Sequence, residues 1–364
     1  MLAHTDNDYS TLVQQQGMLQ DSVRTSLYQF AMLENTADFA GKTVLDVGAG
    51  TGILSFFAAR AGASRVYAVE ASGMASKAEK LAAGNGLSGV VSVINQRVEE
   101  VELANEPDGR VDVLISEPLG IALVNERMLE SYITARDKLL KPGGKMFPDR
   151  ATLFAAPFSD DALYQEQFAK AAFWCQPNFF GVDLNALRDD ALTFYYSQPV
   201  VGPVAPHTIC CPAVSKAFDF TSMSMEAIQR FEIPLSFTLG GITQIHGIAL
   251  WFDCNFPGSQ REVLLGTAPT DPLTHWYQVR CMLRAPLALG TNHRLTGSLR
   301  FEANESRGYN VHMTLLNENT KQEASNTVVT QCALHHFQYT TQQSVPQYYA
   351  QPAAAPTTAT EGVM

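Results

Sequence analysis

Short apolar runs alternate with amphipathic stretches over residues 43 to 149, which is the pattern of strands that alternate with helices. The apolar runs are rich in β-branched residues, and the amphipathic stretches end at glycine. We expect strands over 43–47, 65–69, 90–94 and 111–115, and helices over 53–61, 73–83 and 125–140. The alternation predicts an α/β fold in which a parallel sheet carries helices on both faces.

The pattern changes after Pro148. Residues 151–158 and 231 to about 339 form short β-rich runs with frequent turns, which predicts a mostly antiparallel barrel or sandwich. Residues 160–198 are helical and crowded with aromatic side chains, which could pack under the barrel or cover a second subunit. The Gln-, Pro-, Ala- and Thr-rich segment from 342 onward predicts a disordered tail.

Composition narrows the class of protein. The 364 residues are 46% apolar and 17% charged, which predicts a globular fold of about two domains. The net charge of −11 disfavours nucleic acid and anionic membranes and favours basic partners, or it serves only solubility. The six cysteines have no zinc-like spacing, so we expect no metal site and a reducing compartment. We expect no signal peptide at the polar N-terminus and no apolar run of membrane length.

A glycine-rich loop at residues 48–52 follows the first predicted strand. Glycines here let the backbone turn sharply and approach a ligand. A dinucleotide fingerprint that began at Gly48 would need glycine where the chain has Ile53. Asp46 would repel a pyrophosphate but suits the amino group and sulfonium of S-adenosylmethionine. Asp46 could also be a turn-capping residue.

Two further carboxylates follow strands of the same sheet. Glu70 closes the second strand, where a carboxylate can accept both hydroxyls of a ribose. Glu99 lies just past the third strand and could accept a hydrogen bond from an adenine amino group. These positions predict an S-adenosylmethionine site at the carboxyl edge of the sheet.

Glu117 and Glu126 lie nine residues apart, with Pro118 and Gly120 between them. On one continuous helix, at roughly 100° per residue, that spacing would put them on opposite faces, and the proline and glycine argue against such a helix. A loop that doubles back would aim both carboxylates at one point. Because two converging carboxylates match the fork of a guanidinium, the pair predicts an arginine-binding pocket. The alternative for Glu117 is a solvated loop residue.

The chain resembles the protein arginine methyltransferases, and within them the coactivator-associated arginine methyltransferase branch. The resemblance runs from about residue 9 to about residue 340. It rests on segments 14–16, 18–21, 23–25, 44–48, 69–72, 98–100, 116–118, 125–131 and 274–280, and on the insertion at 166–168, 173–174, 176–177 and 181–184. The glutamate pair together with Thr274-His275-Trp276 is highly specific in combination.

The resemblance implies the organisation of the chain and the roles of its site residues. The domains would be an N-terminal helical segment that covers the cofactor (1–42), a Rossmann-like S-adenosylmethionine-binding domain (43–149), a β-barrel substrate domain (150–341) with a dimerisation arm (about 160–198), and a disordered tail (342–364). The cofactor-binding set is Gln15, Arg24, Asp46, Gly48, Gly50, Glu70, Glu99 and Ser131, with Arg24 on the cofactor carboxylate. The catalytic set is Glu117, Glu126, His275 and Asp21, and the substrate-binding set is Tyr9, Met18, Asn125, Met128 and Trp276.

Residue chemistry alone leaves other roles open for some of these positions. His275 could be an interior histidine bonded to backbone, and Arg24 could cap a helix or pair with a surface carboxylate. Met18 and Met128 could be core fillers, whereas the resemblance implies that they crowd the methyl-accepting nitrogen and favour asymmetric dimethylarginine.

The chain departs from the family pattern at its aromatic positions. Of the N-terminal Tyr-Phe and Tyr residues of the family only Tyr9 is present, and Leu119 and Ile121 replace the Met and Tyr of the glutamate loop. The branch's additional N-terminal domain does not precede residue 1, so we expect a fragment or a short homologue.

The resemblance implies a type I enzyme that methylates arginine in basic proteins such as histones and RNA-binding proteins, giving mono- and asymmetric dimethylarginine. It would act as a head-to-tail homodimer in the nucleus and cytoplasm, as a chromatin and transcription regulator, without binding nucleic acid or membrane directly. The alternatives are a catalytically weak scaffold of the same fold, suggested by the lost aromatic residues, and a small-molecule methyltransferase.

Overall fold

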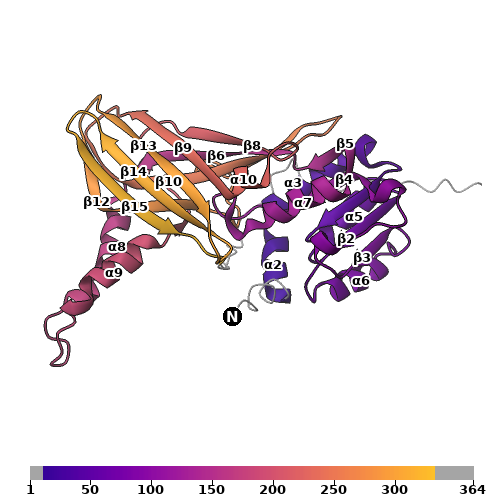
Figure 1. The fold of residues 1–364 in the computed structure, drawn as a ribbon, viewed down its shortest axis with the longest axis horizontal. Coiled ribbons are helices and arrows are strands. Elements are labelled where there is room, and N and C mark those ends of the chain that lie inside the picture. The colour runs from indigo at the N-terminus through magenta and orange to yellow at the C-terminus, as the bar shows by residue number, and fades with distance from the viewer. Residues whose placement is uncertain (1–10, 333–364) are drawn as a thin grey trace, which may run out of the picture.

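The computed structural model describes residues 11–332, so Tyr9 and the predicted tail lie outside the described residues. Two bodies, a parallel sheet with helices and a β-barrel, lie side by side, and a helical arm projects from the barrel (Figure 1). One continuous hydrophobic core runs through both bodies. Tyr28 of α3 and Phe256 of the barrel meet edge to face there, with ring centroids 4.8 Å apart.

The first body is a five-stranded sheet in the order β3-β2-β1-β4-β5, with all pairs parallel. Its strands are β1 (Thr43–Val47), β2 (Arg65–Val69), β3 (Val91–Ile94), β4 (Val111–Ser116) and β5 (Leu140–Phe147). Its helices are α5 (Ile53–Arg60), α6 (Ala75–Gly84) and α7 (Met128–Leu139), preceded by α2 (Leu12–Gln20), α3 (Ser22–Leu33) and α4 (Thr36–Phe39). The predicted parallel α/β sheet is therefore confirmed.

Two details of this body differ from the sequence expectation. The helix predicted over 125–140 begins only at Met128, because Glu126 and Arg127 adopt left-handed backbone angles. Strand β5 was not predicted, because its Pro142 and two glycines indicated a turn. An edge strand tolerates proline, since the missing N–H faces no partner strand, and β5 lies at the edge of the sheet.

The second body is an antiparallel barrel of two sheets, in the orders β7-β12-β10-β6-β8, with β11 paired to β10, and β15-β14-β13-β9. Its strands are β6 (Arg150–Phe158), β7 (Val200–Gly202), β8 (Val214–Asp219), β9 (Arg230–Thr238), β10 (Thr243–Phe256), β11 (Val263–Gly266), β12 (Gln278–Leu289), β13 (Arg294–Ala303), β14 (Tyr309–Asn317) and β15 (Gln322–Val329). The Asn326 amide of β15 donates to the Met282 carbonyl of β12 and so links the two sheets. Strict alternation of buried and exposed residues along β9 puts one face of the strand in the barrel core.

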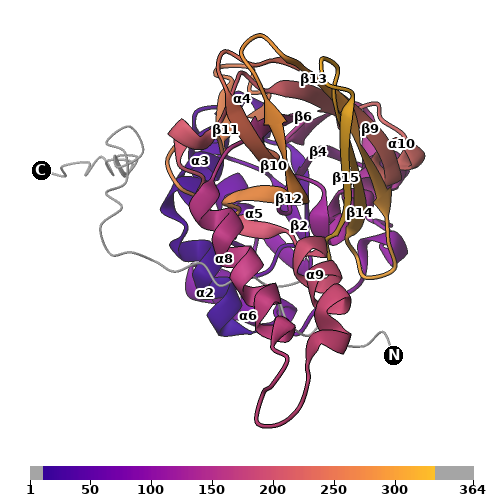
Figure 2. The same cartoon turned by 90° about the vertical axis from the view of Figure 1, so that its left-hand side faces the viewer.

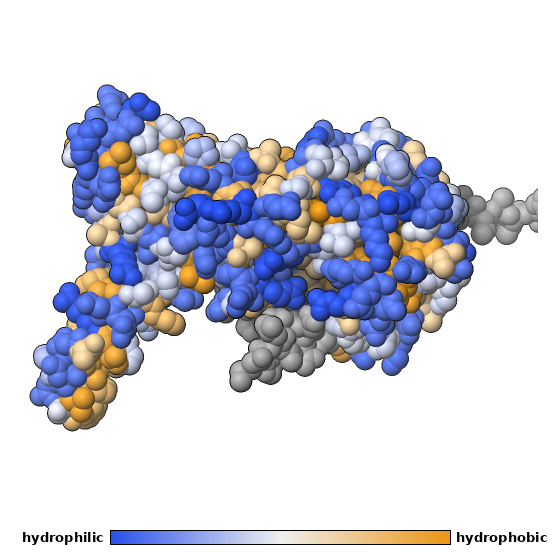
Figure 3. Space-filling view, viewed as in Figure 1, coloured by the Kyte–Doolittle hydropathy of each residue, from blue (hydrophilic) through white to orange (hydrophobic). Residues whose placement is uncertain are grey.

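The arm consists of α8 (Asp161–Ala172) and α9 (Arg188–Ser197), which lie side by side and extend away from both bodies (Figure 2). Hydrophobic residues gather along one side of it (Figure 3). Phe180 is 94% exposed and Phe194 59% exposed. Among residues 11–332, no helix combines the length and apolar character that crossing a bilayer requires.

Candidate active site

A cavity of about 460 Å³ opens at the carboxyl edge of the parallel sheet, where β1 and β4 lie side by side. The register pairs Val47 with Ser116, and the Ser116 hydroxyl donates to the Val47 carbonyl at 2.7 Å. The loops that follow these two strands therefore start together, which is where ligands bind in open α/β sheets. Helix α2 and the barrel segment at His275 and Trp276 also line the cavity.

The glycine-rich loop forms the floor of the cavity. Gly48 and Gly50 have φ values of 70° and 55°, which favour glycine. A Cβ atom on Gly48 would lie 2.7 Å from the Met128 Cε, and one on Gly50 would lie 2.7 Å from the Gln15 Oε1. Any side chain at either position would therefore collide with Met128 or Gln15 in the cavity wall.

Glu70 and Glu99 lie on the same wall as the loop, together with Gln15 and Ser131. The Glu70 carboxylate accepts hydrogen bonds from the Gly50 N–H at 2.8 Å and the Ser72 N–H at 2.7 Å, which fixes its orientation. A carboxylate has about four acceptor positions, so Glu70 retains capacity for hydroxyl donors. The Ser131 hydroxyl donates to Glu99 at 2.7 Å.

Asp46 does not line this cavity, so its prediction as a direct cofactor ligand is corrected. Its side chain is fully buried beneath the loop, and the Ser55 hydroxyl donates to its Oδ2 at 2.6 Å. The other oxygen has no hydrogen-bond partner. Burial raises the pKa of Asp46 to about 7, against the opposing effect of the Ser55 hydrogen bond.

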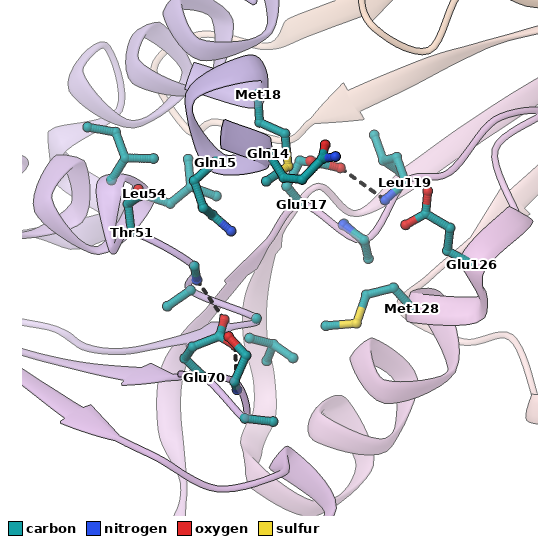
Figure 4. A pocket seen from close by; sticks show the side chains of 18 of the residues that line it. Gln14, Gln15, Met18, Thr51, Leu54, Glu70, Glu117, Leu119, Glu126 and Met128 are labelled. Atoms are coloured by element: carbon teal, nitrogen blue, oxygen red, sulfur yellow. Dashed lines mark hydrogen bonds between the residues drawn. The ribbon is translucent and has the colours of Figure 1, made fainter. Parts of the chain in front are cut away.

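The loop between the two glutamates reverses the chain direction. The Gly120 N–H donates to the Leu123 carbonyl at 3.0 Å, and a Cβ on Gly120 would lie 2.1 Å from the Asn125 carbonyl oxygen. Four non-glycine residues here have left-handed backbone angles: Ala122, Leu123, Glu126 and Arg127. The reversal brings Glu117 and Glu126 to the same cavity, where Figure 4 shows both side chains on the wall opposite Glu70.

Glu117 is bound to Arg24. Its Oε2 accepts hydrogen bonds from Arg24 Nε at 3.0 Å and Nη2 at 2.9 Å, and its Oε1 accepts from the Leu119 N–H at 3.1 Å. Burial lowers the pKa of Arg24, but the charges of Glu117, Tyr28 and Asp21 and the hydrogen bond to Glu117 together outweigh burial and leave that pKa raised. The predicted cofactor-carboxylate ligand thus lies in the cavity and also orients one of the two glutamates.

His275 and Asp21 form the predicted pair. The Asp21 Oδ2 lies 2.8 Å from the His275 ring Nδ1 and accepts the His275 backbone N–H at 2.8 Å. Burial raises the pKa of Asp21, but hydrogen bonds and charge from His275 outweigh burial and hold the pKa below its usual value. The Trp276 ring lies tilted beside His275, with centroids 4.1 Å apart, and its indole N–H donates to the Leu119 carbonyl at 2.8 Å, so the barrel is fastened to the glutamate loop.

The remaining predicted substrate residues divide into two groups. Met18 and Met128 line the cavity, and Figure 4 shows the Met128 sulfur between Glu70 and Glu126. Asn125 does not line it: the side chain is 2% exposed, and its amide donates to the Gln331 carbonyl at 3.1 Å. The prediction of Asn125 as a substrate contact is therefore corrected to a structural role, because its side chain is bonded to the segment that follows β15.

Sequence reasoning missed two arginines, Arg127 and Arg307. Arg127 forms a bidentate ion pair with Glu130, in which Nε donates to Oε1 at 2.6 Å and Nη2 donates to Oε2 at 3.0 Å. Its Nη1 donates to the Asn304 carbonyl at 2.8 Å. Arg307 lines the cavity beside Glu126. Arg127 belongs to the resemblance segment 125–131 but was given no role. Arg307 carried no sequence signal, because it belongs to a barrel turn whose docking against the glutamate loop depends on the tertiary structure.

Comparisons with known proteins agree with this geometry. Residues 44–144 match the family model "Methyltransferase domain", and residues 149–322 match "Arginine methyltransferase oligomerization subdomain". The chain is 50% identical over 308 residues to the probable histone-arginine methyltransferase CARM1 of Oryza sativa subsp. indica, covering 84% of this chain and 58% of that protein. It is 48% identical over 320 residues to the histone-arginine methyltransferase CARMER of Drosophila persimilis, covering 88% and 59%. The chain thus spans less than two thirds of these curated relatives.

Solved structures show the same fold over nearly their whole length. The Trypanosoma brucei PRMT1 enzyme–prozyme heterotetrameric complex with AdoHcy aligns with a TM-score of 0.80 and 31% identity, covering 89% of this chain and 100% of that one. Arabidopsis thaliana protein arginine methyltransferase 10 aligns with a TM-score of 0.79 and 31% identity, covering 89% and 99%. The predicted architecture and the family resemblance are confirmed: the chain belongs to the protein arginine methyltransferase family.

Proposed function

We propose that this chain transfers methyl groups from S-adenosylmethionine to guanidinium nitrogens of arginine in basic proteins such as histones and RNA-binding proteins. The observation that carries the proposal is the convergence of Glu117 and Glu126 on the cavity that the glycine loop and Glu70 also line. The curated relatives carry names that refer to histone-arginine methylation, which supports the choice of substrate class.

The residues of the cavity fit S-adenosylmethionine. Glycines 48 and 50 let the loop pack closely at positions where a Cβ would collide with Met128 or Gln15. Glu70 is oriented by two backbone N–H groups, and Arg24 lies on the cavity wall. Glu70 would hold the ribose, Glu99 the adenine and Arg24 the carboxylate. S-Adenosylmethionine supplies an electrophilic methyl group when it is bound.

Two carboxylates give the site its preference for a guanidinium. Each can accept a charge-assisted hydrogen bond from the substrate, and together they hold the planar fork in one orientation. The two carboxylates also favour the cationic form of the product, because both are in place around the guanidinium before the reaction begins. The proton that leaves the nitrogen could pass to His275, whose Nδ1 is held by Asp21 and whose other ring nitrogen is the one left for a proton.

We further propose type I specificity, that is, asymmetric dimethylarginine. Met18 and Met128 support it, because both line the cavity and their flexible thioethers can crowd one side of a guanidinium. An apolar wall on that side would leave only one terminal nitrogen accessible, so both methyl groups would be added to that nitrogen. Leu119 and Ile121, which replace the Met and the Tyr of the family loop, are buried at 6% exposure each.

The exposed aromatic residues of the arm support a proposed head-to-tail homodimer. Phe180, Phe194 and Val182 present apolar surface that neither body covers. For localisation we propose both the nucleus, where histones are available, and the cytoplasm, where RNA-binding proteins also occur. Imaging of a fluorescently tagged chain in cells tests that assignment.

Transfer of tritium from labelled S-adenosylmethionine to an arginine peptide tests the proposed reaction. We expect transfer to an arginine peptide and none to a matched peptide with lysine in its place. Glu126→Gln should keep cofactor binding and lower the rate by about 100-fold or more, because it removes charge from the clamp. Glu323→Gln, an exposed position on β15, should change neither.

Each outcome of this assay is informative. Cofactor binding without transfer by the wild-type chain would favour the scaffold alternative, for which the replaced aromatic positions are the sequence argument. An unchanged rate in Glu126→Gln would count against the two-carboxylate clamp.

A further inference from the structure

The β13–β14 turn (residues 304–308) of the barrel docks on the loop that carries Glu126. The Arg307 Nε donates to the Glu126 carbonyl oxygen at 3.3 Å, and Arg127 Nη1 donates to the Asn304 carbonyl oxygen at 2.8 Å. The turn is itself tightly held, because the Asn304 side-chain oxygen accepts the N–H groups of Ser306 and Gly308, both at 3.0 Å.

The turn is also fixed to the end of the barrel. The Asn304 amide donates to the Thr330 carbonyl at 3.0 Å, and the Cys332 N–H donates to the Ser306 carbonyl at 3.0 Å. A Cβ on Gly308 would lie 2.1 Å from the Thr330 carbonyl oxygen, so this packing leaves no space. The β13–β14 turn is therefore a rigid support rather than a loose loop.

The backbone that this turn supports is strained. Glu126 and Arg127 are consecutive non-glycine residues with φ values of 70° and 58°. Left-handed angles are unfavourable for such residues and persist only where the surrounding contacts impose them. Because the direction of the Glu126 side chain depends on these angles, whatever holds them also aims the carboxylate.

Arg307 differs from the other supporting residues because it lines the cavity itself. Its guanidinium therefore adds a positive charge to the wall that holds Glu126. A substrate arginine in the cavity would bring its sequence neighbours close to that wall. A basic neighbour would meet a like charge there, and a neutral or acidic neighbour would not.

Given the proposed methyl transfer, we infer that Arg307 is a positioning and selectivity residue. It holds the Glu126 backbone in the conformation that aims the carboxylate at the cavity, and it disfavours a basic residue directly beside the target arginine. The side chain acts through two separable features, the hydrogen bond from Nε and the positive charge. Lysine keeps the positive charge but has neither the Nε donor nor the planar guanidinium of arginine.

Steady-state kinetics of Arg307→Ala and Arg307→Lys with a pair of single-arginine peptides separate these features. One peptide has alanine on each side of the arginine, and the other has lysine there. For the alanine-flanked peptide, kcat/KM should fall roughly 10-fold in both variants, because a hydrogen bond from a charged donor is lost or misplaced. The dissociation constant for S-adenosylmethionine, measured by calorimetry, should not change.

The preference between the two peptides is the second measurement, and a purely structural role of Arg307 would leave this preference unchanged. The wild type should prefer the alanine-flanked peptide, Arg307→Lys should keep that preference, and Arg307→Ala should reduce it about 2- to 5-fold. Arg300→Ala is the matched control, because Arg300 lies on β13, the strand that leads into this turn, with a side chain 47% exposed. The control should retain both the rate and the preference of the wild type.

The result that would overturn the inference is an active wild type whose rate and peptide preference survive in Arg307→Ala. An inactive wild type would instead contradict the proposed function. If Arg307→Ala lost S-adenosylmethionine binding as well, a general structural role would replace the positioning role.

Discussion

At the scale of single residues, the Asp46 carboxyl is a titratable group that is fully removed from water. One oxygen accepts from Ser55, the other has no hydrogen-bond partner, and no part of the side chain is exposed. Burial favours the neutral carboxyl, which raises the pKa to about 7 from an ordinary value of 3.8. The folded protein therefore binds a proton at this site between those two values, whereas the unfolded chain does not.

We predict that Asp46→Asn makes stability less dependent on pH. Because the folded-state pKa is raised, the free energy of unfolding of the wild type falls as the pH rises from 3.8 to about 7, by at most roughly 1.4 kcal/mol per pH unit from this group. Asparagine cannot ionise and can still accept from Ser55. Urea unfolding at several pH values within that window should show a flatter profile for the variant.

The exposed Asp190→Asn serves as the control and should follow the wild-type profile. Parallel profiles for the wild type and Asp46→Asn would show that Asp46 is ionised in the folded protein, contrary to its burial.

Residue types and spacing were sufficient to predict four carboxylates of the cavity wall. Glu70, Glu99 and the glutamate pair follow buried strands, and the carboxyl ends of parallel strands meet at one edge. Asp46 was misassigned for a physical reason. Successive side chains of a strand point to opposite faces of the sheet, and the sequence does not reveal that the face with Asp46 is buried. The Arg24–Glu117 ion pair joins residues 93 positions apart and has no local signal.

At the scale of elements, a loop between β10 and β11 fastens the barrel to the N-terminal helices. The fully buried Asn35 amide donates to the carbonyls of Ala31 and Arg261, both at 2.8 Å. Its oxygen accepts the N–H groups of Gln260 and Arg261 at 2.9 and 2.8 Å. Asp38 adds hydrogen bonds to Ser259, so this contact fixes α3, the helix that carries Arg24.

We predict that Asn35→Ala lowers the free energy of unfolding by roughly 2–4 kcal/mol, because it removes the four hydrogen bonds that a fully buried side chain makes to backbone groups. Chemical denaturation measures the loss. Asn85→Ala removes one exposed hydrogen bond, from the side-chain amide to the Leu81 carbonyl, and should lower the free energy of unfolding by less than about 1 kcal/mol. Equal losses in the two variants would argue against a fastening role for Asn35.

Element predictions succeeded where apolar runs were long and failed where a tertiary neighbour decided the outcome. Strands β1, β2 and β4 begin within a residue of their predicted starts, because buried β-branched runs are distinctive. Strand β5 contains Lys141-Pro142-Gly143-Gly144, which reads as a turn. Gly144 is required there because a Cβ would lie 2.6 Å from Leu140 Cδ1 and 2.9 Å from the Asp112 carbonyl.

At the scale of the whole molecule, the exposed apolar surface of the arm predicts self-association. Phe180→Asn should weaken a homodimer, because it removes an aromatic side chain that is 94% exposed in one chain, and asparagine tolerates the left-handed φ of 50° at this position. Sedimentation velocity over a range of concentrations measures the shift toward the mass of one chain.

Ile242→Asn is the control for that measurement, because Ile242 is 88% exposed in the β9–β10 hairpin of the barrel and is not part of the arm. It should leave the association unchanged. A wild-type chain that sediments as a monomer at every concentration would contradict the proposed dimer.

The most direct test of the two-carboxylate clamp is mass spectrometry of a single-arginine peptide after reaction with the wild-type chain and S-adenosylmethionine. Fragmentation should locate every added methyl group on the arginine side chain, with two methyl groups on one terminal nitrogen at long times, and Glu126→Gln should yield little or no product. A peptide that stays unmodified while the cofactor binds, or one methylated at a residue other than arginine, would contradict the account.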